Sequence, residues 1–405
     1  MGNNGPLSGV KVLEFTHWLS APYCGNILSD LGAEVIKVES PSGDQVRKTG
    51  SYYKDGESYL YLVYNHGKKG LVLDLKKEKG IQIALDLIKK SDVLIENFRP
   101  GKMDKLGLGY EQARKNNEKI IYCSISAFGN TPEYIDRPGM DPIIQGMGAA
   151  MSMTANDENS PPLLPGVPIA DNSTAMMAFG AISAALYERE KSGIGQKIDL
   201  NLIDMMVFNL STRFGQYLAT GENPTPMGNQ HSQVVPYQAF STKNGWIMAG
   251  AQADHAWEPF CRAIKREDLI SIEKFSTNQK RVVHREELTN LLNTVFKDRT
   301  TEEWCETLEQ NNILHGPIWG IHELINSDLI KDHEVIVEAK HSKIGNIPVI
   351  KSPISYSRTK VEVQSAANLL GEHTYQVLEE LGYSDQEIDD LLNHGVVSAS
   401  ERPVV

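Results

Sequence analysis

Several common functional patterns are missing from this 405-residue sequence. Its four cysteines stand far apart, so no pair has the spacing of a metal site or a redox motif. We interpret them as reduced thiols of a cytosolic protein. The eleven histidines form neither an HExxH motif nor a comparable pattern, so the sequence supports no metal site. No apolar run reaches the roughly 18 residues that a membrane-spanning helix requires.

Positive charge is also scarce, with 40 Lys and Arg against 52 Asp and Glu and a formal net charge of -12. Nucleic acid is therefore not expected as a partner, because phosphate backbones require a basic surface. A small phosphorylated ligand needs only a local basic cluster. At the start of the chain no apolar region indicates a signal peptide, and Pro6 stands where N-myristoylation requires Ser or Thr. We expect a cytoplasmic protein with no membrane partner.

The first third of the chain alternates strand patterns with helix patterns. Short stretches rich in Val, Ile and Leu are separated by longer amphipathic ones such as residues 78–90. The expected strands cover residues 10–15, 33–38, 71–75, 93–96 and 120–125. Strands separated by helices imply a mostly parallel sheet that is covered on both faces. We therefore predict an α/β fold.

The pattern changes in the second half of the chain. Residues 221–236 form a loop rich in Gly, Asn, Pro and Gln, after which a smaller unit is expected. The elements expected outside the first third are helices at 172–188, 203–218, 257–265, 286–296, 374–381 and 385–392, strands at 197–200 and 246–249, and an irregular return segment at 342–365. We predict a large domain over 1–220, a small domain with its connecting loop over 221–340, and a return segment over 341–405 that completes the large domain.

Basic residues gather near the ends of two expected strands. They are Lys68, Lys69, Lys76, Lys77 and Lys79 around the third strand, and Arg99, Lys102 and Lys105 after the fourth. Loops at the carboxyl ends of parallel strands share one crevice, where such residues together could neutralise a diphosphate. For any single lysine, solvated surface charge is the simpler interpretation. Glu39 closes the second strand as a ribose-binding acid would, but the G-x-G-x-x-G motif of dinucleotide-binding domains is absent before Leu28, which disfavours that class.

One carboxylate, Asp171, stands where a loop ends and a helix begins. It follows Pro165-Gly166-Val167-Pro168 and precedes an apolar stretch rich in Ala and Met. Asp is a favoured helix N-cap, which accepts hydrogen bonds from the first free N–H groups. The same residue could be a nucleophile, since N–H groups at a helix start keep a carboxylate ionised and able to attack a carbonyl. The two interpretations are compatible.

Short motifs follow one another in a characteristic order along the chain. They are PLSGVKVLE at 6–14, AP at 21–22, LGAEVIKVE at 31–39, GD at 43–44 with Arg47, Asn65 with Lys68 and Lys69, LDLK at 73–76, ENFRPG at 96–101, KLG at 105–107, Asp141 with Gln145, the segment around Asp171, and LGEHT at 370–374. Each motif alone is weak, but the ordered series is specific. By these motifs the chain resembles, over nearly its whole length, the family III CoA-transferases, which include the carnitine, formyl-CoA/oxalate and bile-acid CoA-transferases.

The resemblance implies a Rossmann-like large domain with a parallel sheet, a smaller inserted α+β domain, and a homodimer of two interlocked protomers. It implies that Asp171 is the catalytic nucleophile. The residues that it implies for CoA binding are His17, Ala21, Lys76, Asn97, Phe98, Arg99, Lys105 and Arg137. The implied reaction moves CoA from an acyl-CoA donor to a small carboxylic acid through an aspartyl mixed anhydride and an aspartyl-CoA thioester. Coenzyme A is then a substrate, and no permanently bound cofactor is expected.

Two departures from the family pattern bear on the particular activity. The loop at 226–231 has a single glycine, Gly228, whereas formyl-CoA/oxalate members carry a run of glycines there. The α-methylacyl-CoA racemases, which are similar in fold, place a His before the Asp of the Asp141 motif, and here that residue is Met140. A thioether cannot shuttle the α-proton, so transfer is favoured over racemisation. A racemase-like enzyme and a catalytically silent CoA-binding protein are the alternatives.

Overall fold

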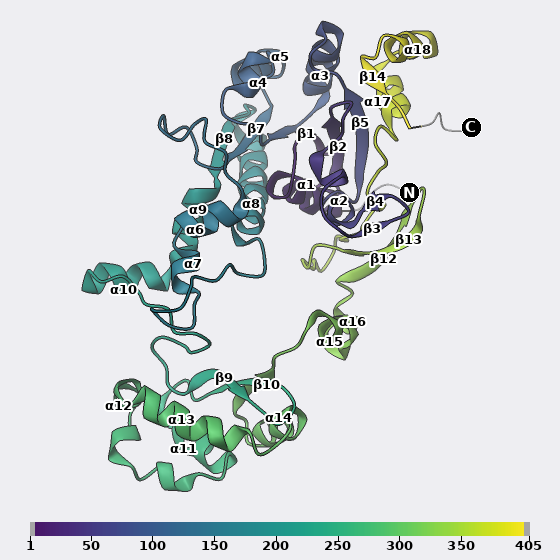
Figure 1. The fold of residues 1–405 in the computed structure, drawn as a ribbon. Helices are drawn as coiled ribbons and strands as arrows, with labels where there is room; N and C mark the ends of the chain where they lie inside the picture. Colours follow the sequence, from purple (N-terminus) through teal and green to yellow (C-terminus); the bar gives the residue numbers. More distant parts are fainter. Residues whose placement is uncertain (1–4, 401–405) are drawn as a thin grey trace. The chain divides into compact units, whose positions relative to one another are not determined.

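The computed structural model describes residues 5–400, so the prediction about the first four residues of the chain lies outside its description. The chain divides into two compact units (Figure 1). The first unit comprises Met1–Ala150, Leu164–Gly215 and Lys331–Val405, and the second comprises Met151–Leu163 and Gln216–Ile330. Within the described residues, no helix combines the length and the apolar character that crossing a membrane requires.

A seven-stranded sheet forms the centre of the first unit (Figure 1). Its strands, in spatial order, are β14 (Val397–Ser398), β5 (Lys68–Leu73), β2 (Glu34–Glu39), β1 (Lys11–Phe15), β6 (Val93–Glu96), β7 (Ile121–Ser126) and β8 (Lys197–Asn201). All neighbours pair in parallel except β14, which is antiparallel to β5. The predicted α/β class with a mostly parallel sheet is confirmed. The strand order reverses between β1 and β6, and ligands of such sheets bind at this switch point, outside the carboxyl ends of the strands.

Helices cover both faces of this sheet because successive strand residues point to opposite sides. Val12 of β1 packs in a cluster with α1 (Ser20–Asp30), α8 (Ile169–Ser192) and α9 (Leu202–Leu210). Leu13, the next residue, packs in the opposite cluster. The helices of that second cluster are α3 (Glu78–Lys90), α5 (Tyr110–Asn116), α17 (Thr374–Leu381) and α18 (Asp385–Asn393). The short apolar strands predicted from the sequence are therefore buried on both faces.

The single helix predicted over 203–218 is wrong, because the structure divides this stretch into α9 and α10 (Thr212–Thr220). The break falls at Ser211, whose φ of 45° cannot belong to a right-handed helix. Positive φ is uncommon for a residue other than glycine, and neither Gly nor Pro marks this position. The hydrophobic pattern therefore continues across Ser211, although the helical conformation of the backbone is interrupted there.

The expectation of a wholly irregular return segment at 342–365 also needs correction. Its beginning contains the strand β13 (Gly345–Ile350), which forms a hairpin with β12 (Ile336–His341) just before the segment. Ile347 and Val349 are buried between exposed neighbours, which is the alternation of a strand with one covered face. After the hairpin, the backbone N–H of Ser352 donates to the carboxylate of Asp30 on α1 at 2.7 Å.

The second unit has its own core around a three-stranded antiparallel sheet (Figure 1). The strand order is β11 (Leu314–Pro317), β10 (Trp246–Gly250) and β9 (Tyr237–Ser241). Its helices are α11 (Asp254–Ala263), α12 (Asn278–Val283), α13 (Arg285–Phe296), α14 (Thr301–Gln310) and α15 (Ile321–Asn326). Phe240, Phe260 and Phe296 are fully buried in its core, with the Phe240 and Phe296 rings stacked 4.2 Å apart.

Short elements complete the chain. They are β3 (Tyr53–Lys54), β4 (Glu57–Ser58), α2 (Tyr59–Tyr64), α4 (Lys102–Lys105), α6 (Asp141–Met147), α7 (Ala150–Met153), α16 (Asp328–His333), and 3-10 turns at Gln45–Arg47, Glu267–Leu269 and Glu273–Phe275.

Candidate active site

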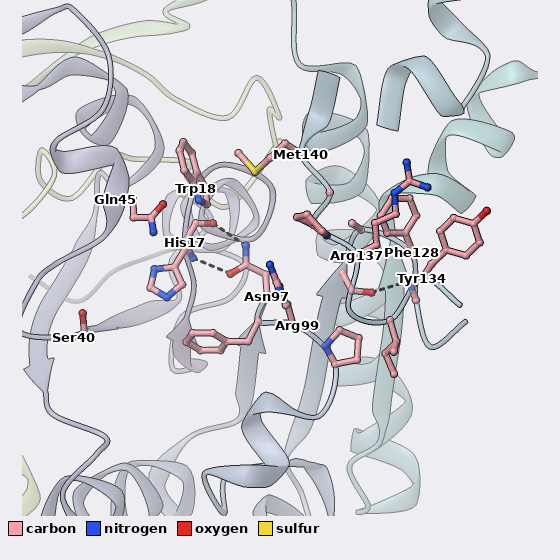
Figure 2. Close-up of a pocket in the computed structure, with 18 of the residues that line it drawn as sticks. His17, Trp18, Ser40, Gln45, Asn97, Arg99, Phe128, Tyr134, Arg137 and Met140 are labelled. Atoms are coloured by element: carbon pink, nitrogen blue, oxygen red, sulfur yellow. Dashed lines mark hydrogen bonds between the residues drawn. The ribbon is translucent and has the colours of Figure 1, made fainter. Parts of the chain in front are cut away.

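A cavity of about 470 Å³ opens at the switch point of the parallel sheet (Figure 2). It is lined by the loops that follow four strands: His17 and Trp18 after β1, Ser40, Ser42, Gly43 and Gln45 after β2, Asn97 to Pro100 after β6, and Ser126 to Gly129 with Tyr134, Ile135 and Arg137 to Met140 after β7. Because parallel strands end at the same edge, loops far apart in sequence meet here.

Asn97 joins the loop after β6 to the loop after β1. Its side-chain oxygen accepts a hydrogen bond from the backbone N–H of His17 at 2.8 Å, and its amide nitrogen donates to the His17 carbonyl at 2.7 Å (Figure 2). The His17 ring meets the Phe98 ring edge-on at 5.0 Å. Burial lowers the pKa of His17, against the opposing effect of the Asp44 carboxylate. His17 therefore presents a neutral imidazole at neutral pH.

A buried group of charges supports these loops from within the sheet. Lys37 on β2 lies 3.7 Å from Glu14 on β1 and 3.2 Å from Asp44, and its ammonium donates to the Thr16 carbonyl at 3.0 Å. Lys68 on β5 pairs with Glu14 at 2.8 Å. Removing one partner of such a buried pair typically costs ~3–5 kcal/mol, because the other charge is left uncompensated. The loops after β1 and β2 are thus held in one arrangement.

A second cavity of about 550 Å³ shares His17, Ser40, Ser42 and Phe98 with the first. Most of its other lining side chains are apolar, and two lysines stand among them. The additional lining residues are Phe15, Val38, Glu39, Pro41, Leu73, Asp74, Leu75, Lys76, Lys102 and Leu106. An apolar slot with nearby ammonium groups suits a ligand that combines an aromatic ring with phosphates.

Asp171 lies in the first turn of α8. The helix begins at Ile169 with Pro168 in the N-cap position, so the prediction that Asp171 caps the helix is wrong. The backbone N–H of Asp171 instead donates to the Asp141 carboxylate at 3.1 Å. Asp141 is buried at the start of α6 and also accepts a hydrogen bond from the Gln145 amide. Asp171 is thereby attached to the start of α6, and Met140, the residue just before α6, lines the first cavity.

The pKa of the Asp171 carboxyl is raised to about 7. Burial is the main cause, the negative charge of Asp141 adds to it, and a hydrogen bond from Ser20 opposes it. The expectation that helix N–H groups keep this carboxylate ionised is therefore corrected, because desolvation and a like charge outweigh them here. A carboxylate with a pKa near neutrality is more basic than an exposed one and is a stronger nucleophile when ionised.

The structure brings most of the residues implied for CoA binding to the two cavities. His17, Asn97, Phe98, Arg99 and Arg137 line the first, and Lys76 lines the second. The Arg137 guanidinium stands 5.5 Å from the centre of the Tyr134 ring. Two implied residues are placed elsewhere: the Ala21 side chain is fully buried in the core, and Lys105 ends α4 and lines neither cavity.

Some lining positions were not predicted from the sequence. The loop after β2 contributes Ser40, Ser42 and Gly43, and the loop after β1 contributes Trp18. The polar run Ser-Pro-Ser-Gly-Asp directly after a strand could have indicated the former. Among residues 5–400, no group of three or more His, Cys, Asp and Glu side chains is placed to hold a metal ion.

The fold and the site define an α/β protein with a cavity at the switch point of its sheet and, attached to the segment after Met140, a carboxyl of raised pKa. The model of CoA-transferase family III matches residues 7–374, and the chain belongs to this family. It is 37% identical over 403 residues to the succinyl-CoA:glutarate CoA-transferase of Homo sapiens, covering 99% of this chain and 92% of that protein. It is 32% identical to the formyl-CoA:oxalate CoA-transferase of Streptomyces avermitilis, covering 96% of this chain and 99% of that one.

A solved structure of a CAIB/BAIF family protein from Brucella suis has the same fold, with a TM-score of 0.85 and 34% identity, over 94% of this chain and all of that one.

Proposed function

We propose that this family III CoA-transferase moves CoA from an acyl-CoA donor to a free carboxylic acid, with Asp171 as the nucleophile. The observation that carries the proposal is the setting of Asp171: a carboxyl with a pKa of about 7, hydrogen-bonded by Ser20 and joined through Asp141 to the cavity segment. Asp171 itself lines neither cavity, and Asp141, which holds it, directly follows the lining residue Met140. A buried carboxyl with so perturbed a pKa is characteristic of a reacting group.

The proposed reaction balances without any added reagent. The Asp171 carboxylate attacks the thioester carbonyl, which gives a mixed anhydride and CoA thiolate. The thiolate then attacks the aspartyl carbonyl, which releases the donor acid and leaves an aspartyl-CoA thioester. The acceptor carboxylate attacks this thioester to form a second anhydride and thiolate, and the thiolate takes the acceptor acyl group while Asp171 is regenerated. The covalent route divides the transfer into successive displacements at one carboxylate that the protein holds in place.

The residues around Asp171 have distinct parts in this proposal. Asp141 holds the Asp171 backbone through the 3.1 Å hydrogen bond and, by its charge, raises the basicity of the nucleophile. Ser20 donates to the carboxyl and so orients it for attack. The site must also exclude water, because the anhydride intermediates hydrolyse readily.

We propose that CoA binds in the two adjoining cavities. The apolar walls of the 550 Å³ cavity suit the adenine ring, and Lys76 and Lys102 suit the phosphates that it carries. The 470 Å³ cavity, with Arg99 and Arg137, shares part of its lining with that cavity and reaches Met140, the residue before Asp141. The thioester would then approach the nucleophile from the carboxyl end of the sheet, where such ligands bind.

We propose small dicarboxylic acids as the acceptor class and succinyl-CoA as a donor. The support is that similar proteins are named for succinyl-CoA with glutarate or mesaconate, and others for oxalate. The test incubates the protein with succinyl-CoA and a panel of mono- and dicarboxylic acids, with products identified by mass spectrometry. Glutaryl-CoA and free succinate should appear together in equal amounts. Absence of transfer from succinyl-CoA to every acid of the panel would refute the proposed donor and acceptor class.

The rate of transfer should rise with pH through about 7, because only ionised Asp171 attacks and its pKa is about 7. Below that pH, kcat/KM should fall by about tenfold per unit. Asp141→Asn should move the inflection to lower pH, since it removes the neighbouring negative charge. Steady-state kinetics between pH 5 and 9 measure the pH dependence of kcat/KM. An inflection that Asp141→Asn does not move would contradict the assignment of this titration to Asp171.

The pH dependence of stability runs opposite to that of the rate. The folded protein holds the Asp171 proton more tightly than the unfolded chain does, so the contribution of this carboxyl to stability falls as pH rises from about 4 to about 7.

Replacing Lys76 and Lys102 together by Ala should raise the KM for acyl-CoA roughly tenfold and leave kcat nearly unchanged, since both lysines line the second cavity. The CoA affinity of the unmodified protein should also weaken with salt. Lys105→Ala is the matched control, because Lys105 ends the neighbouring helix but lines neither cavity. Equal CoA affinity in the double variant and the unmodified protein, measured by calorimetry, would show that these lysines are only surface charge.

We also propose the interlocked homodimer, with residues 221–340 as the inserted small domain and 1–220 and 341–405 as the large one. Supporting it, large apolar side chains are exposed on the helices of the first unit, including Met176 and Tyr187 on α8 and Phe208 on α9. In the second unit Trp319 and Ile321 are exposed as well. Exposed apolar side chains that gather on one surface commonly mark a protein–protein interface.

A further inference from the structure

We propose that Glu96 is a positioning residue that holds the loop Asn97 to Arg99 in the shape required to bind the CoA thioester. This inference rests on the proposed CoA site, because the loop lines both cavities of that site. Glu96 is the first residue of the motif ENFRPG at 96–101.

The contacts of Glu96 point directly at the loop. Glu96 is the last residue of β6 and is only 6% exposed. One carboxyl oxygen accepts the backbone N–H of Phe98 at 2.9 Å, and the other accepts the hydroxyl of Ser124 on the adjacent strand β7. The side chain therefore turns back and binds the backbone two residues later, which bends the chain as it leaves the sheet.

The bend determines where three cavity-lining side chains stand. The Asn97 side chain points at the backbone of His17. Its oxygen accepts the His17 N–H at 2.8 Å, and its nitrogen donates to the His17 carbonyl at 2.7 Å. Phe98 meets the His17 ring edge-on and lines both cavities. Arg99 reaches the first cavity. Releasing the Phe98 N–H from Glu96 would loosen all three side chains at once. It would also weaken the contacts of Asn97 and Phe98 with His17, which join the loops after β1 and β6.

Burying the Glu96 carboxyl costs free energy of folding, because burial disfavours the charged form of a carboxyl. A purely structural role would not require this residue type. Burial raises the pKa of Glu96 to about 7, against the hydrogen bonds from Ser124 and Phe98 and the charge of Lys197, while Asp104 adds to the rise. The carboxyl borders a third cavity of about 340 Å³, which shares Arg99, Pro100, Ser126 and Gly129 with the first cavity. The other charged or titratable groups facing that space are Arg99, Asp104 of α4, Tyr110 of α5, Tyr122 of β7, Lys197 and Asp199 of β8, and Asp204 of α9.

The test compares Glu96→Gln with Glu96→Leu. Gln keeps an oxygen that accepts the Phe98 N–H and an amide that donates to Ser124, whereas Leu keeps neither at similar size. Loss of a hydrogen bond to a buried charged group corresponds to roughly tenfold or more in affinity. Glu96→Leu should therefore raise the KM for acyl-CoA about tenfold, with the KM for the acceptor acid and kcat changed less than about threefold. Glu96→Gln should stay within about threefold of the unmodified protein in all three.

Ser124→Ala is the matched control, because it removes the other hydrogen bond of the same carboxyl and leaves the Phe98 contact in place. It should change the KM for acyl-CoA less than about twofold. The affinity for free CoA, measured by calorimetry, follows the same order and does not depend on turnover, so it separates failure of this inference from failure of the proposed transfer. If Glu96→Leu folded with an unchanged melting temperature and bound CoA normally, or if Ser124→Ala weakened CoA as strongly, the positioning role would be overturned. Should Glu96→Leu not fold, a Glu96→Gln variant with tenfold weaker CoA binding would overturn it equally.

Discussion

Asp171→Asn should abolish CoA transfer while the fold and the affinity for CoA stay nearly intact. Asn has the size of Asp but cannot form an anhydride or a thioester, so the rate should fall by at least about three orders of magnitude. Little stability is at risk, because Asp171 is not the N-cap of α8. Loss of the carboxyl also removes its repulsion with Asp141, which raises the pKa of Asp171 in the unmodified protein. The melting temperature at pH 8 should therefore not decrease.

A matched control distinguishes the chemistry from a general effect of a carboxylate at a helix start. Asp204 is also in the first turn of a helix, α9, and is exposed. Asp204→Asn should retain transfer. In the unmodified protein, hydroxylamine added with acyl-CoA should trap the aspartyl intermediate, and peptide mapping should find the modification on Asp171. A variant Asp171→Asn with more than about a tenth of the original activity, or a modified peptide elsewhere, would contradict the nucleophile assignment.

The sheet of the first unit was predictable because its strands are short, apolar and separated by amphipathic helices. The predicted helix at 78–90 and the strand at 93–96 agree with α3 and β6 residue for residue. The break at Ser211 and the hairpin of β12 and β13 were not predictable in this way. Ser211 adopts its positive φ without a glycine, and β13 contains Pro348, a residue that usually argues against a strand.

The site was predictable in part, since loops after parallel strands must share one crevice. That rule brings His17, Asn97 and Arg99 together from separate parts of the chain. It does not reveal that the Asn97 amide is already engaged with the His17 backbone. It also could not reveal the contact of Asp171 with Asp141, 30 residues apart in the chain, because this contact depends on how α6 packs against α8.

The protein should form a dimer of twice the 45.0 kDa of one chain that does not dissociate on dilution. Differently tagged dimers, mixed at room temperature, should exchange no subunits over hours. If the protomers are threaded through each other, separating them requires partial unfolding, so the barrier is kinetic as well as thermodynamic. Native mass spectrometry of the mixture measures the fraction of mixed dimers directly.

The control for this experiment is a mixture that is unfolded together in denaturant and refolded. Mixed dimers should then form in statistical proportion, which shows that the tags do not prevent pairing. The exposed apolar side chains of α8 and α9 should also become protected from chemical modification in the dimer, because an interface covers them. A single species of 45.0 kDa by light scattering, or exchange within minutes, would contradict the interlocked arrangement. Either result would leave the chemistry of Asp171 untouched, since Ser20, Asp141 and the lining of both cavities come from one chain.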